Sequence, residues 1–358
     1  MMKRKVKNIL LRWKLEGRGI VNYDDKKQTL AFWNKGKPVD GLNHLIDLND
    51  NVSYAKKNIY ENIVINDKGE EVKAANYKIA ISSQCLKSAI FPDEGYNSSI
   101  NSNKDLKLMY YATPEMLVRG FMTTISGGAG EKKKSCLNLS YAEQTNDAKS
   151  VLGFHSRRSE KETGDKDKSG ITLHKKEEVG EITYMSEGDI DIQSMQFLSF
   201  DLLYDRQMIN PDDFEKFKYF LKSKLPSFNS DINYFTLNSG SDKTPEYGCL
   251  LSNDDINFLV RRILEMMMEA QVKRTHAFAK TSKLEYKLVY DPIDDVFDKE
   301  NGWVSLEKRK DIEDFECDFE IFYSEADEKI SKELREAMKV YAEKEDKSES
   351  KKTKSKKK

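Results

Sequence analysis

The stretch that says most about the fold is Tyr77-Lys78-Ile79-Ala80-Ile81-Ser82-Ser83-Gln84-Cys85-Leu86-Lys87-Ser88-Ala89-Ile90. Its first residues alternate at the period of two that is typical of a strand, and its later apolar residues recur at the helical period. Ser82 or Ser83 can cap the helix, and Pro92 cannot continue it. The pattern predicts a strand running into a helix whose start, with two hydroxyls, an amide and the Lys87 ammonium, suits a phosphate. An ordinary capped helix packed behind a strand fits the same residues.

This stretch and three further motifs resemble the Cas-seven family, the backbone subunits of type I CRISPR surveillance complexes, and the four occur along the chain in the order found in that family. The three further motifs are a basic first strand that ends Gly17-Arg18-Gly19-Ile20-Val21-Asn22-Tyr23, the segment Leu139-Ser140-Tyr141-Ala142-Glu143-Gln144-Thr145-Asn146, and the segment 194–209. The resemblance covers residues 5–325. The Gly-Ile-Val-Asn ending of the first strand is most similar to a variant type I-F subunit.

The resemblance implies an α+β fold with a ferredoxin-like or RRM-like core and large finger and thumb insertions, whereas the sequence pattern alone gives only a mixture of α and β. It implies a non-catalytic subunit that polymerises with copies of itself along a guide RNA (crRNA) as a helical filament. The guide then pairs with target DNA or RNA, so the protein needs phosphate contacts and shape rather than a base code. The implied partners are Cas-five-like and Cas-six-like subunits and a helicase-nuclease effector, without a cofactor or a membrane.

Two alternatives belong to the enzyme class. Related type III backbone subunits cut bound target RNA with a loop aspartate, and Asp24 and Asp25 follow the first strand here. An unrelated metabolic protein could carry the same clusters by coincidence. However, the four histidines lack metal-binding spacing, and no Gly-x-Ser-x-Gly elbow is present. We therefore expect no catalytic residue and no metal site.

The charge of the chain argues in two directions. A net charge of −1 over 358 residues is an objection to nucleic-acid binding, because nucleic-acid-binding domains usually carry excess positive charge. Residues 1–14, however, hold six Lys or Arg and no acid, and residues 291–320 hold twelve acids against four bases. This asymmetry suits a basic groove and head-to-tail packing of identical subunits. Four scattered cysteines and the lack of a long apolar run predict a cytoplasmic protein.

We expect one hand-shaped domain over residues 1–345 and a disordered Lys-rich tail at 346–358. Composition and charge predict insertions outside the core at about 92–135, 156–181 and 226–249, the last as a thumb-like hairpin. Other predicted elements are a strand at 63–65 within an otherwise irregular 34–76, helices from Asn210, from Ser252 or Asn253, and over 325–344, and strands at 284–290 and 315–323.

The candidate RNA-binding residues are basic, hydroxyl or amide side chains that could line one groove. The family motif carries over to the helix start, and strict alternation over residues 11–16 puts two bases on the polar face of the first strand. The cluster before the strand at 284–290 suits a phosphate or ribose, and Arg119 is either a phosphate ligand or a surface charge. The set is Arg12, Lys14, Arg18, Asn22, Lys78, Ser82, Ser83, Gln84, Lys87, Arg119, Lys280, Thr281, Ser282 and Lys283.

The loop at 127–135 is rich in glycine and lysine but is not a Walker A loop. That loop needs glycine directly before its Lys-Ser pair, and Lys133 stands there instead. A flexible basic loop that contacts a polyanion and a merely solvated loop both fit.

Overall fold

The computed structural model describes the side chains in most of the chain and, in further strands, the backbone alone. Side chains are described for residues 4–18, 80–91, 103–122, 130–146, 180–201, 206–239, 244–273, 278–290 and 301–327, and for several residues between 329 and 336. The strands between residues 19 and 79, at 150–159 and at 170–179 are described by their backbone. Asp24, Asp25 and the tail at 346–358 lie outside the described residues.

The main sheet is antiparallel and is built around β1 (Asn8–Asn22), which pairs with β18 (Ala277–Val289) on one side and β13 (Gly170–Ile190) on the other. Its path is β17-β18-β1-β13-β11-β7-β3-β4. The other strands on this path are β17 (Gln271–Arg274), β11 (Ala142–Gln144), β7 (Glu71–Ile81), β3 (Trp33–Asn34) and β4 (Lys37–Pro38). Four further strands pair with strands of this path. Strands β10 (Leu137–Leu139) and β12 (Ser150–Ser159) pair with β13, β19 (Val304–Leu306) pairs with β18, and β6 (Ala55–Ile65) pairs with β7.

Strand β1 has one buried and one polar face, as its alternation predicts. Leu11, Trp13 and Leu15 are fully buried on the inner face. Trp13 Nε1 donates to Thr281 Oγ1 at 2.9 Å, and Thr281 Oγ1 donates to the Met267 carbonyl at 2.6 Å. These two hydrogen bonds join β1, β18 and the helix that covers the inner face, so the position of β1 is fixed by packing and by paired polar groups.

Two helices pack on the inner face of this sheet, α1 (Ser83–Ile90) beside β17 and α7 (Asn253–Glu269) beside β18. Ser82 caps α1, and a capping box of Ser252 and Asp255 begins α7, as the sequence predicts. The apolar face expected for α7 is fully buried. Its residues are Ile256, Leu259, Val260, Ile263, Leu264 and Met267.

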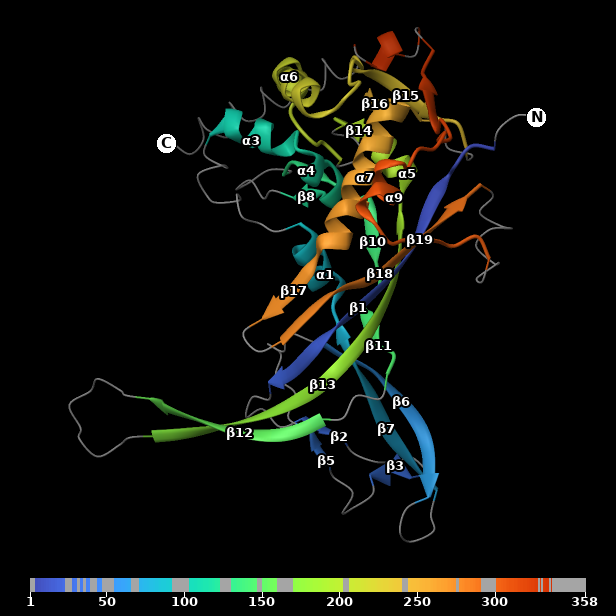
Figure 1. The fold of residues 1–358 in the computed structure, drawn as a ribbon. Helices are drawn as coiled ribbons and strands as arrows, with labels where there is room; N and C mark the ends of the chain where they lie inside the picture. The colour runs from blue at the N-terminus through green and yellow to red at the C-terminus, as the bar shows by residue number, and fades with distance from the viewer. Residues whose placement is uncertain are drawn as a thin grey trace, which may run out of the picture.

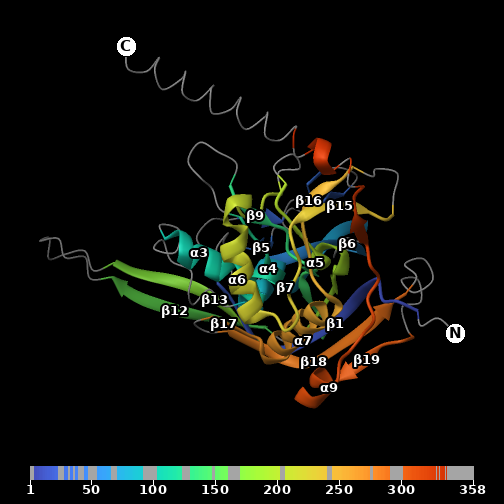
Figure 2. The ribbon, with the colours of Figure 1, turned by 90° about the horizontal axis from the view of Figure 1, so that it is seen from above.

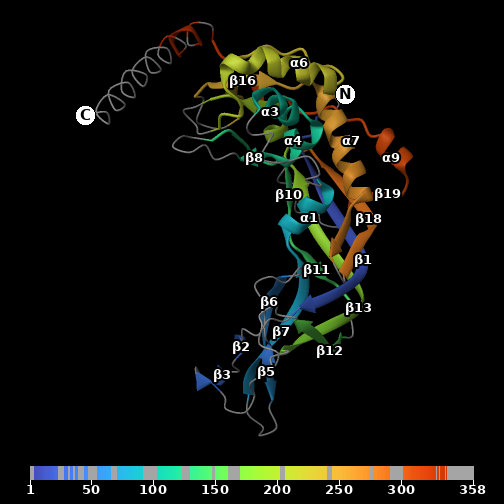
Figure 3. The same ribbon diagram turned by 90° about the vertical axis from the view of Figure 1, so that its left-hand side faces the viewer.

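The remaining helices and a smaller sheet gather at one end of the molecule, whereas β6 and β7 reach the other end (Figures 1 and 3). The helices are α3 (Lys104–Tyr111), α4 (Pro114–Arg119), α5 (Ile192–Gln196), α6 (Phe214–Lys224), α9 (Arg309–Glu313) and the 3-10 turn η1 (Pro211–Asp213). The smaller sheet has the order β14 (Phe197–Ser199), β16 (Glu246–Leu250), β15 (Asn233–Leu237) and β20 (Tyr323–Glu325). Two hairpin pairs are β2 (Gln28–Leu30) with β5 (His44–Ile46), and β8 (Phe121–Met122) with β9 (Lys132–Lys133).

The three regions expected to be insertions have three different outcomes. Within 92–135, α3 and α4 contribute Leu108, Tyr111 and Leu117 to the main core, so this part is not an insertion outside it. Residues 156–181 fall mostly in the β12–β13 hairpin, which projects from the sheet as an arm in Figures 1 and 2.

The hairpin at 226–249 does not reach out as a thumb. Strands β15 and β16 lie in the smaller sheet, and two aromatic residues of this hairpin, Tyr234 and Phe235, are buried. The prediction failed because this pair packs on its own chain: Phe235 contacts Phe197 edge to face.

The segment predicted as a strand at 315–323 is instead held by two asparagines of α7. Asn257 accepts from Cys317 N at 2.9 Å and donates to its carbonyl oxygen at 2.9 Å, and Asn253 Oδ1 accepts from Phe319 N at 3.0 Å. Val6 adds an isolated parallel bridge to Phe319, in which Val6 N donates to the Asp318 carbonyl at 2.8 Å and Glu320 N donates to the Val6 carbonyl at 2.9 Å. In this segment, which is described throughout, a strand begins only at residue 323.

Two other predictions need correction. Residues 34–76 are not irregular around a short strand at 63–65, because β6 begins at residue 55 and β7 at residue 71. The helix expected over 325–344 begins later than residue 325, which ends β20: residues 329, 331–334 and 336 are helical, and most of this range lies outside the described residues. Among the described residues, no helix combines the length and apolar character that crossing a membrane requires.

Candidate nucleic-acid interface

The outer face of the main sheet, opposite α1 and α7, carries most of the basic residues predicted on strands. On β1 these are Arg12, Lys14 and Arg18, which alternate with the buried residues of the inner face. The register with β18 brings Lys283 opposite Lys14, and Lys280 opposite Glu16 on the same face. The sheet therefore brings five predicted residues together.

The part of this outer face around Arg12 and Lys14 of β1 is a set of ion pairs, and we call it the ion-paired half. Arg12 Nε lies 3.5 Å from Glu187 Oε1, and the Arg12 guanidinium lies 4.2 Å from the centre of the Trp303 ring. Lys14 pairs with Glu16 at 2.7 Å, and Lys283 pairs with Glu285 at 2.7 Å. The hydrogen bond from Lys14 holds the pKa of Glu16 below its usual value. A phosphate approaching here competes with carboxylates already in place. The ion-paired half is Arg12, Trp303, Lys14, Glu16, Lys283, Glu285 and Glu187.

The part of the outer face around Arg18 of β1, which we call the aromatic half, consists of Arg18, Phe278 and Lys280. Phe278 is directly opposite Arg18 in the register of β1 and β18 and is 47% exposed, although it is a large apolar side chain. Arg18 and Lys280 are exposed on the same face. An exposed ring flanked by two cations suits stacking of a base with contacts to its phosphates.

Close contact between β1 and β18 in the aromatic half depends on Gly17. A Cβ atom at Gly17 would lie 1.9 Å from the Phe278 carbonyl oxygen, so no other residue fits without separating the strands. The sequence predicts a basic connection at residues 275–283, in which Phe278 is not a candidate. The missed signal is the spacing of Phe278, Lys280 and Lys283 along β18, since the first two are on the outer face at the strand period.

Two residues of the predicted cluster on β18 have structural roles. The hydroxyl of Thr281 lies toward the inner face, between Trp13 and α7, and is occupied by the two hydrogen bonds described above. Ser282 is exposed at the bulge in the register, and its Oγ donates to the Lys14 carbonyl at 3.4 Å. Thr281 therefore stabilises the sheet rather than facing a ligand.

The start of α1 is only part of the site predicted there. Ser82 Oγ accepts from the backbone N–H of Cys85 at 3.3 Å, and Ser83 and Gln84 follow in the first turn. Lys87 is in the last turn, however, where its Nζ donates to Ser135 Oγ at 3.0 Å. Burial lowers the pKa of Lys87. The helix is only eight residues long, and its lysine is a tether to the segment after β9.

The last predicted residues lie apart from both groups. Arg119 ends α4, and its Nη1 donates to the Phe91 carbonyl at 3.4 Å, so it joins α4 to the end of α1. Burial lowers the pKa of this guanidinium. Asn22 and Lys78 belong to β1 and β7, but their side chains lie outside the described residues.

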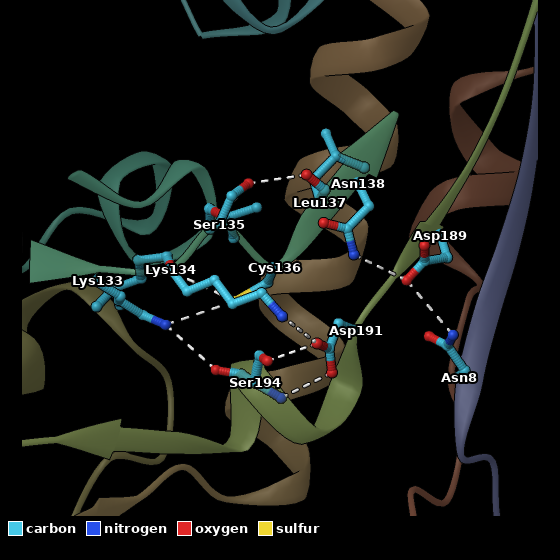
Figure 4. A network of polar contacts seen from close by, with 12 residues as sticks. Asn8, Lys133, Lys134, Ser135, Cys136, Leu137, Asn138, Asp189, Asp191 and Ser194 are labelled. Carbon is cyan, nitrogen blue, oxygen red and sulfur yellow. Dashed lines mark hydrogen bonds and ion pairs between the residues drawn. The ribbon is translucent and has the colours of Figure 1, made fainter. Parts of the chain in front are cut away.

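The end of the basic loop at 127–135 enters a polar network (Figure 4). Lys133 Nζ donates to the Ser194 carbonyl at 3.3 Å and to Cys136 Sγ at 3.5 Å, and Lys134 Nζ lies 3.5 Å from Asp191 Oδ2. Asp191 in turn accepts from Ser194 N at 2.9 Å and caps α5. Of the two readings left open for this loop, the described part is neither free nor simply solvated: it is anchored on α5.

Catalytic chemistry finds no support among the described residues. No group of three or more His, Cys, Asp or Glu side chains there is arranged to hold a metal ion. The four cysteines carry free thiols, and burial raises the pKa of Cys317 to about 11, which disfavours a thiolate nucleophile. The two aspartates considered for RNA cleavage lie outside the described residues.

The chain is similar to a protein family over most of its length and to solved structures at low identity. The family model described as type I-Fv CRISPR-associated protein Cas7fv-like matches residues 5–313. Among similar solved structures, a chain of a CRISPR RNA-guided surveillance complex has 8% identity and a TM-score of 0.29, with 77% of this chain and 68% of that chain covered. A chain of such a complex described as pre-nicking has 8% identity and a TM-score of 0.33, with 78% and 75% covered. The curated proteins include no match to this chain.

Proposed function

Because the chain belongs to the Cas7fv-like family of type I-Fv CRISPR-associated proteins, we propose that it is a non-catalytic, RNA-binding backbone subunit of a CRISPR surveillance complex. Several copies coat one guide RNA and leave its bases free to pair with target nucleic acid. The observation that carries this proposal is the family match over residues 5–313.

The core of the fold is compatible with the RRM-like reading. The chain order β1, α1, β11, β13, α7, β18 gives a sheet order of β18-β1-β13-β11, with both helices on one face. A split βαββαβ fold has this arrangement. We take residues 1–345 as one domain built on this core, with the tail at 346–358 outside it.

The outer face of this sheet is the surface we assign to the guide. Phe278 stacks on a base while Arg18 and Lys280 contact the flanking phosphates. In the ion-paired half, exposed pairs such as Lys14 with Glu16 contribute little stability by themselves, so a phosphate can replace the carboxylate. Lys14, Lys283 and Arg12 thus also contact the guide, and each contributes less binding free energy than a residue of the aromatic half.

Polymerisation requires two different complementary faces, since a self-complementary face would stop at a dimer. The basic N-terminal residues and the acidic segment at 291–320 are matched in charge for such faces. The β12–β13 arm extends beyond the sheet and is long enough to contact a neighbouring copy in a filament (Figure 2). Cas-five-like and Cas-six-like subunits would end the filament, and a helicase-nuclease effector would act on the paired target.

Light scattering of the full chain with a series of single-stranded RNA lengths tests the assembly. The mass should rise in steps as the RNA lengthens, because each subunit occupies a fixed number of nucleotides. A fixed dimer at every length would overturn polymerisation. No RNA binding at low salt would overturn the proposed function.

A further inference from the structure

A cleft of about 650 Å³ lies away from the outer face, between the β8–β9 hairpin, α5 and the smaller sheet. Its volume is within the range of roughly 300–1,000 Å³ that small-molecule sites occupy. Its walls come from parts of the chain that are far apart in sequence, including the end of the basic loop at 127–135. The outer-face assignment makes no use of it.

Cationic side chains predominate in this cleft. Lys132, Lys133, Lys134 and Arg206 line it, against the carboxylates of Asp191 and Glu246. Lys134 is 73% exposed and reaches Asp191 only at 3.5 Å, which leaves its ammonium accessible to a ligand. The charge balance favours a ligand with one or two negative charges.

Glu246, one of the two acids of the cleft, is already paired with neighbouring side chains. Glu246 Oε1 accepts a hydrogen bond from Ser199, and Oε2 lies 3.3 Å from Arg206 Nη1. Burial raises the pKa of Glu246, which reduces the repulsion that an anion would meet. Arg206 is 62% exposed and faces the ligand space as well as Glu246.

The apolar residues of the cleft lie on two sides. Phe121 and Met122, the latter 71% exposed, lie beside Lys133 and Lys132 on the β8–β9 hairpin. Phe197 and Tyr323 lie in the smaller sheet, stacked with centroids 4.7 Å apart and an interplanar angle of 23°, and both are buried. Aromatic and thioether groups suit a flat heterocycle, as cations suit the phosphate attached to it.

We propose that this cleft binds a nucleoside phosphate, with the phosphate at Lys132, Lys134 and Arg206 and the base against Phe121 and Met122. The ligand is either a free nucleotide or one nucleotide unit of a single strand, and the second source rests on the proposed function. The cleft would then be a second nucleic-acid contact, separate from the outer face.

Calorimetric titration of the full chain with uridine 5′-monophosphate, ribose 5-phosphate and a short oligouridylate tests this assignment. Uridine 5′-monophosphate should bind about fivefold or more tighter than ribose 5-phosphate, because only the nucleotide brings a base. Equal affinity would reduce the cleft to a phosphate site and overturn the proposal. Tighter binding of the oligouridylate that is weakened by Lys134→Glu identifies a strand as the source, and tighter binding of the mononucleotide identifies a free nucleotide.

The matched variants are Lys134→Glu in the cleft and Lys224→Glu on α6, both at exposed lysines. Lys134→Glu should weaken mononucleotide binding about tenfold or more, while Lys224→Glu changes it less than twofold. Thermal melting of both variants checks that they fold. If the two variants bind alike while the wild-type chain still assembles on long RNA, the cleft assignment fails and the proposed function stands.

Discussion

The two halves of the outer sheet face carry similar cations in opposite settings. In the ion-paired half, Lys14 and Lys283 each have a glutamate at 2.7 Å. In the aromatic half, Arg18 and Lys280 flank an exposed phenylalanine, Phe278, and their glutamates, Glu181 and Glu16, lie opposite them on neighbouring strands. The same residue types on the same strands therefore predict different energetics toward a phosphate.

The difference shows why counting basic residues along a strand overstates a binding site. A lysine paired with glutamate must exchange one anion for another when RNA arrives, so its net gain is small. A cation beside an exposed ring exchanges water for phosphate and adds stacking of a base. We therefore expect the affinity for RNA to be concentrated in the aromatic half.

The largest effect is expected from a substitution at Gly17, because separating β1 from β18 disrupts both halves of the outer face. Gly17→Ala puts a methyl group 1.9 Å from the Phe278 carbonyl oxygen and forces β1 away from β18. We expect about 3 kcal/mol lower stability, measured by denaturant unfolding. Glu16→Ala, on the exposed face beside it, is the control and should change stability by less than about 1 kcal/mol. A Gly17→Ala chain as stable as the wild type would mean that the two strands are not held as closely as described.

The second largest effect separates the halves. Phe278→Ala should weaken single-stranded RNA binding by roughly 5- to 150-fold, because one stacking contact is worth about 1–3 kcal/mol. Its exposure of 47% predicts little loss of stability. Fluorescence anisotropy measures the affinity, and Tyr219→Ala, at an exposed aromatic on α6, is the control. Equal affinities of the two variants would remove the aromatic half from the interface.

Charge in the aromatic half is tested by salt dependence. If about five phosphates are neutralised, the slope of log K against log salt should be near −3.5, from roughly −0.7 per contact. Arg18→Gln with Lys280→Gln should make the slope less steep by about 1.4. Lys222→Gln with Lys224→Gln on α6 should leave it unchanged. An unchanged slope in the first double variant would place the phosphates elsewhere.

A smaller and opposite pair of effects is expected in the ion-paired half. Lys283→Gln should weaken RNA binding and Glu285→Gln should strengthen it, each by less than about fivefold, since an exposed pair is worth about 1 kcal/mol or less. The sign of the Glu285→Gln effect decides whether the glutamates compete with RNA. Weaker binding in this variant would show that the carboxylate instead supports the site.

The smallest effect is a titration. Lys14 holds the pKa of Glu16 below its usual value, so Lys14→Gln should raise that pKa toward the ordinary glutamate range. The stabilisation from this pair is present at neutral pH and is lost as the pH falls through the lowered pKa in the folded state. Carbon-13 NMR of the side-chain carboxyl follows the change. An unmoved pKa would mean that the pair is not formed in solution.

The sequence predicted the elements whose pattern and end signals agree. The alternation of β1, the start of α7 at Ser252 or Asn253 and the junction at Ser82 were confirmed, and so were the Cas-seven family and its variant type I-F assignment. Each is a local pattern that the tertiary contacts reinforce.

Other elements depended on partners that are remote in sequence. The alternation at 315–323 is that of a strand, but Asn253 and Asn257 of α7 bind its backbone groups first. The polar composition of 92–135 concealed α3 and α4, although Asn103 and Thr113 cap them. Composition averages over a window, so it misses short capped helices that bury only one face.

For the site, the sequence identified cations but not the atoms around them. Lys87 matches the family motif, yet it is bound to Ser135, and the hydroxyl of Thr281 is occupied inside the sheet. The glutamate opposite Arg12 follows from strand register, which a single sequence does not determine, whereas Glu285 lies two residues from Lys283 on the same strand. Phe278 became a candidate only when β18 was seen to continue through the predicted connection.

Photo-crosslinking of single-stranded RNA containing 4-thiouridine to the full chain tests most directly that the aromatic half of the outer face holds the guide. Cross-linked peptides identified by mass spectrometry should include residues 277–289 of β18, with Phe278 as the main site, and the Phe278→Ala chain should lose this cross-link. Cross-links confined to α1 or other helices, with none on β1 or β18, would contradict the account.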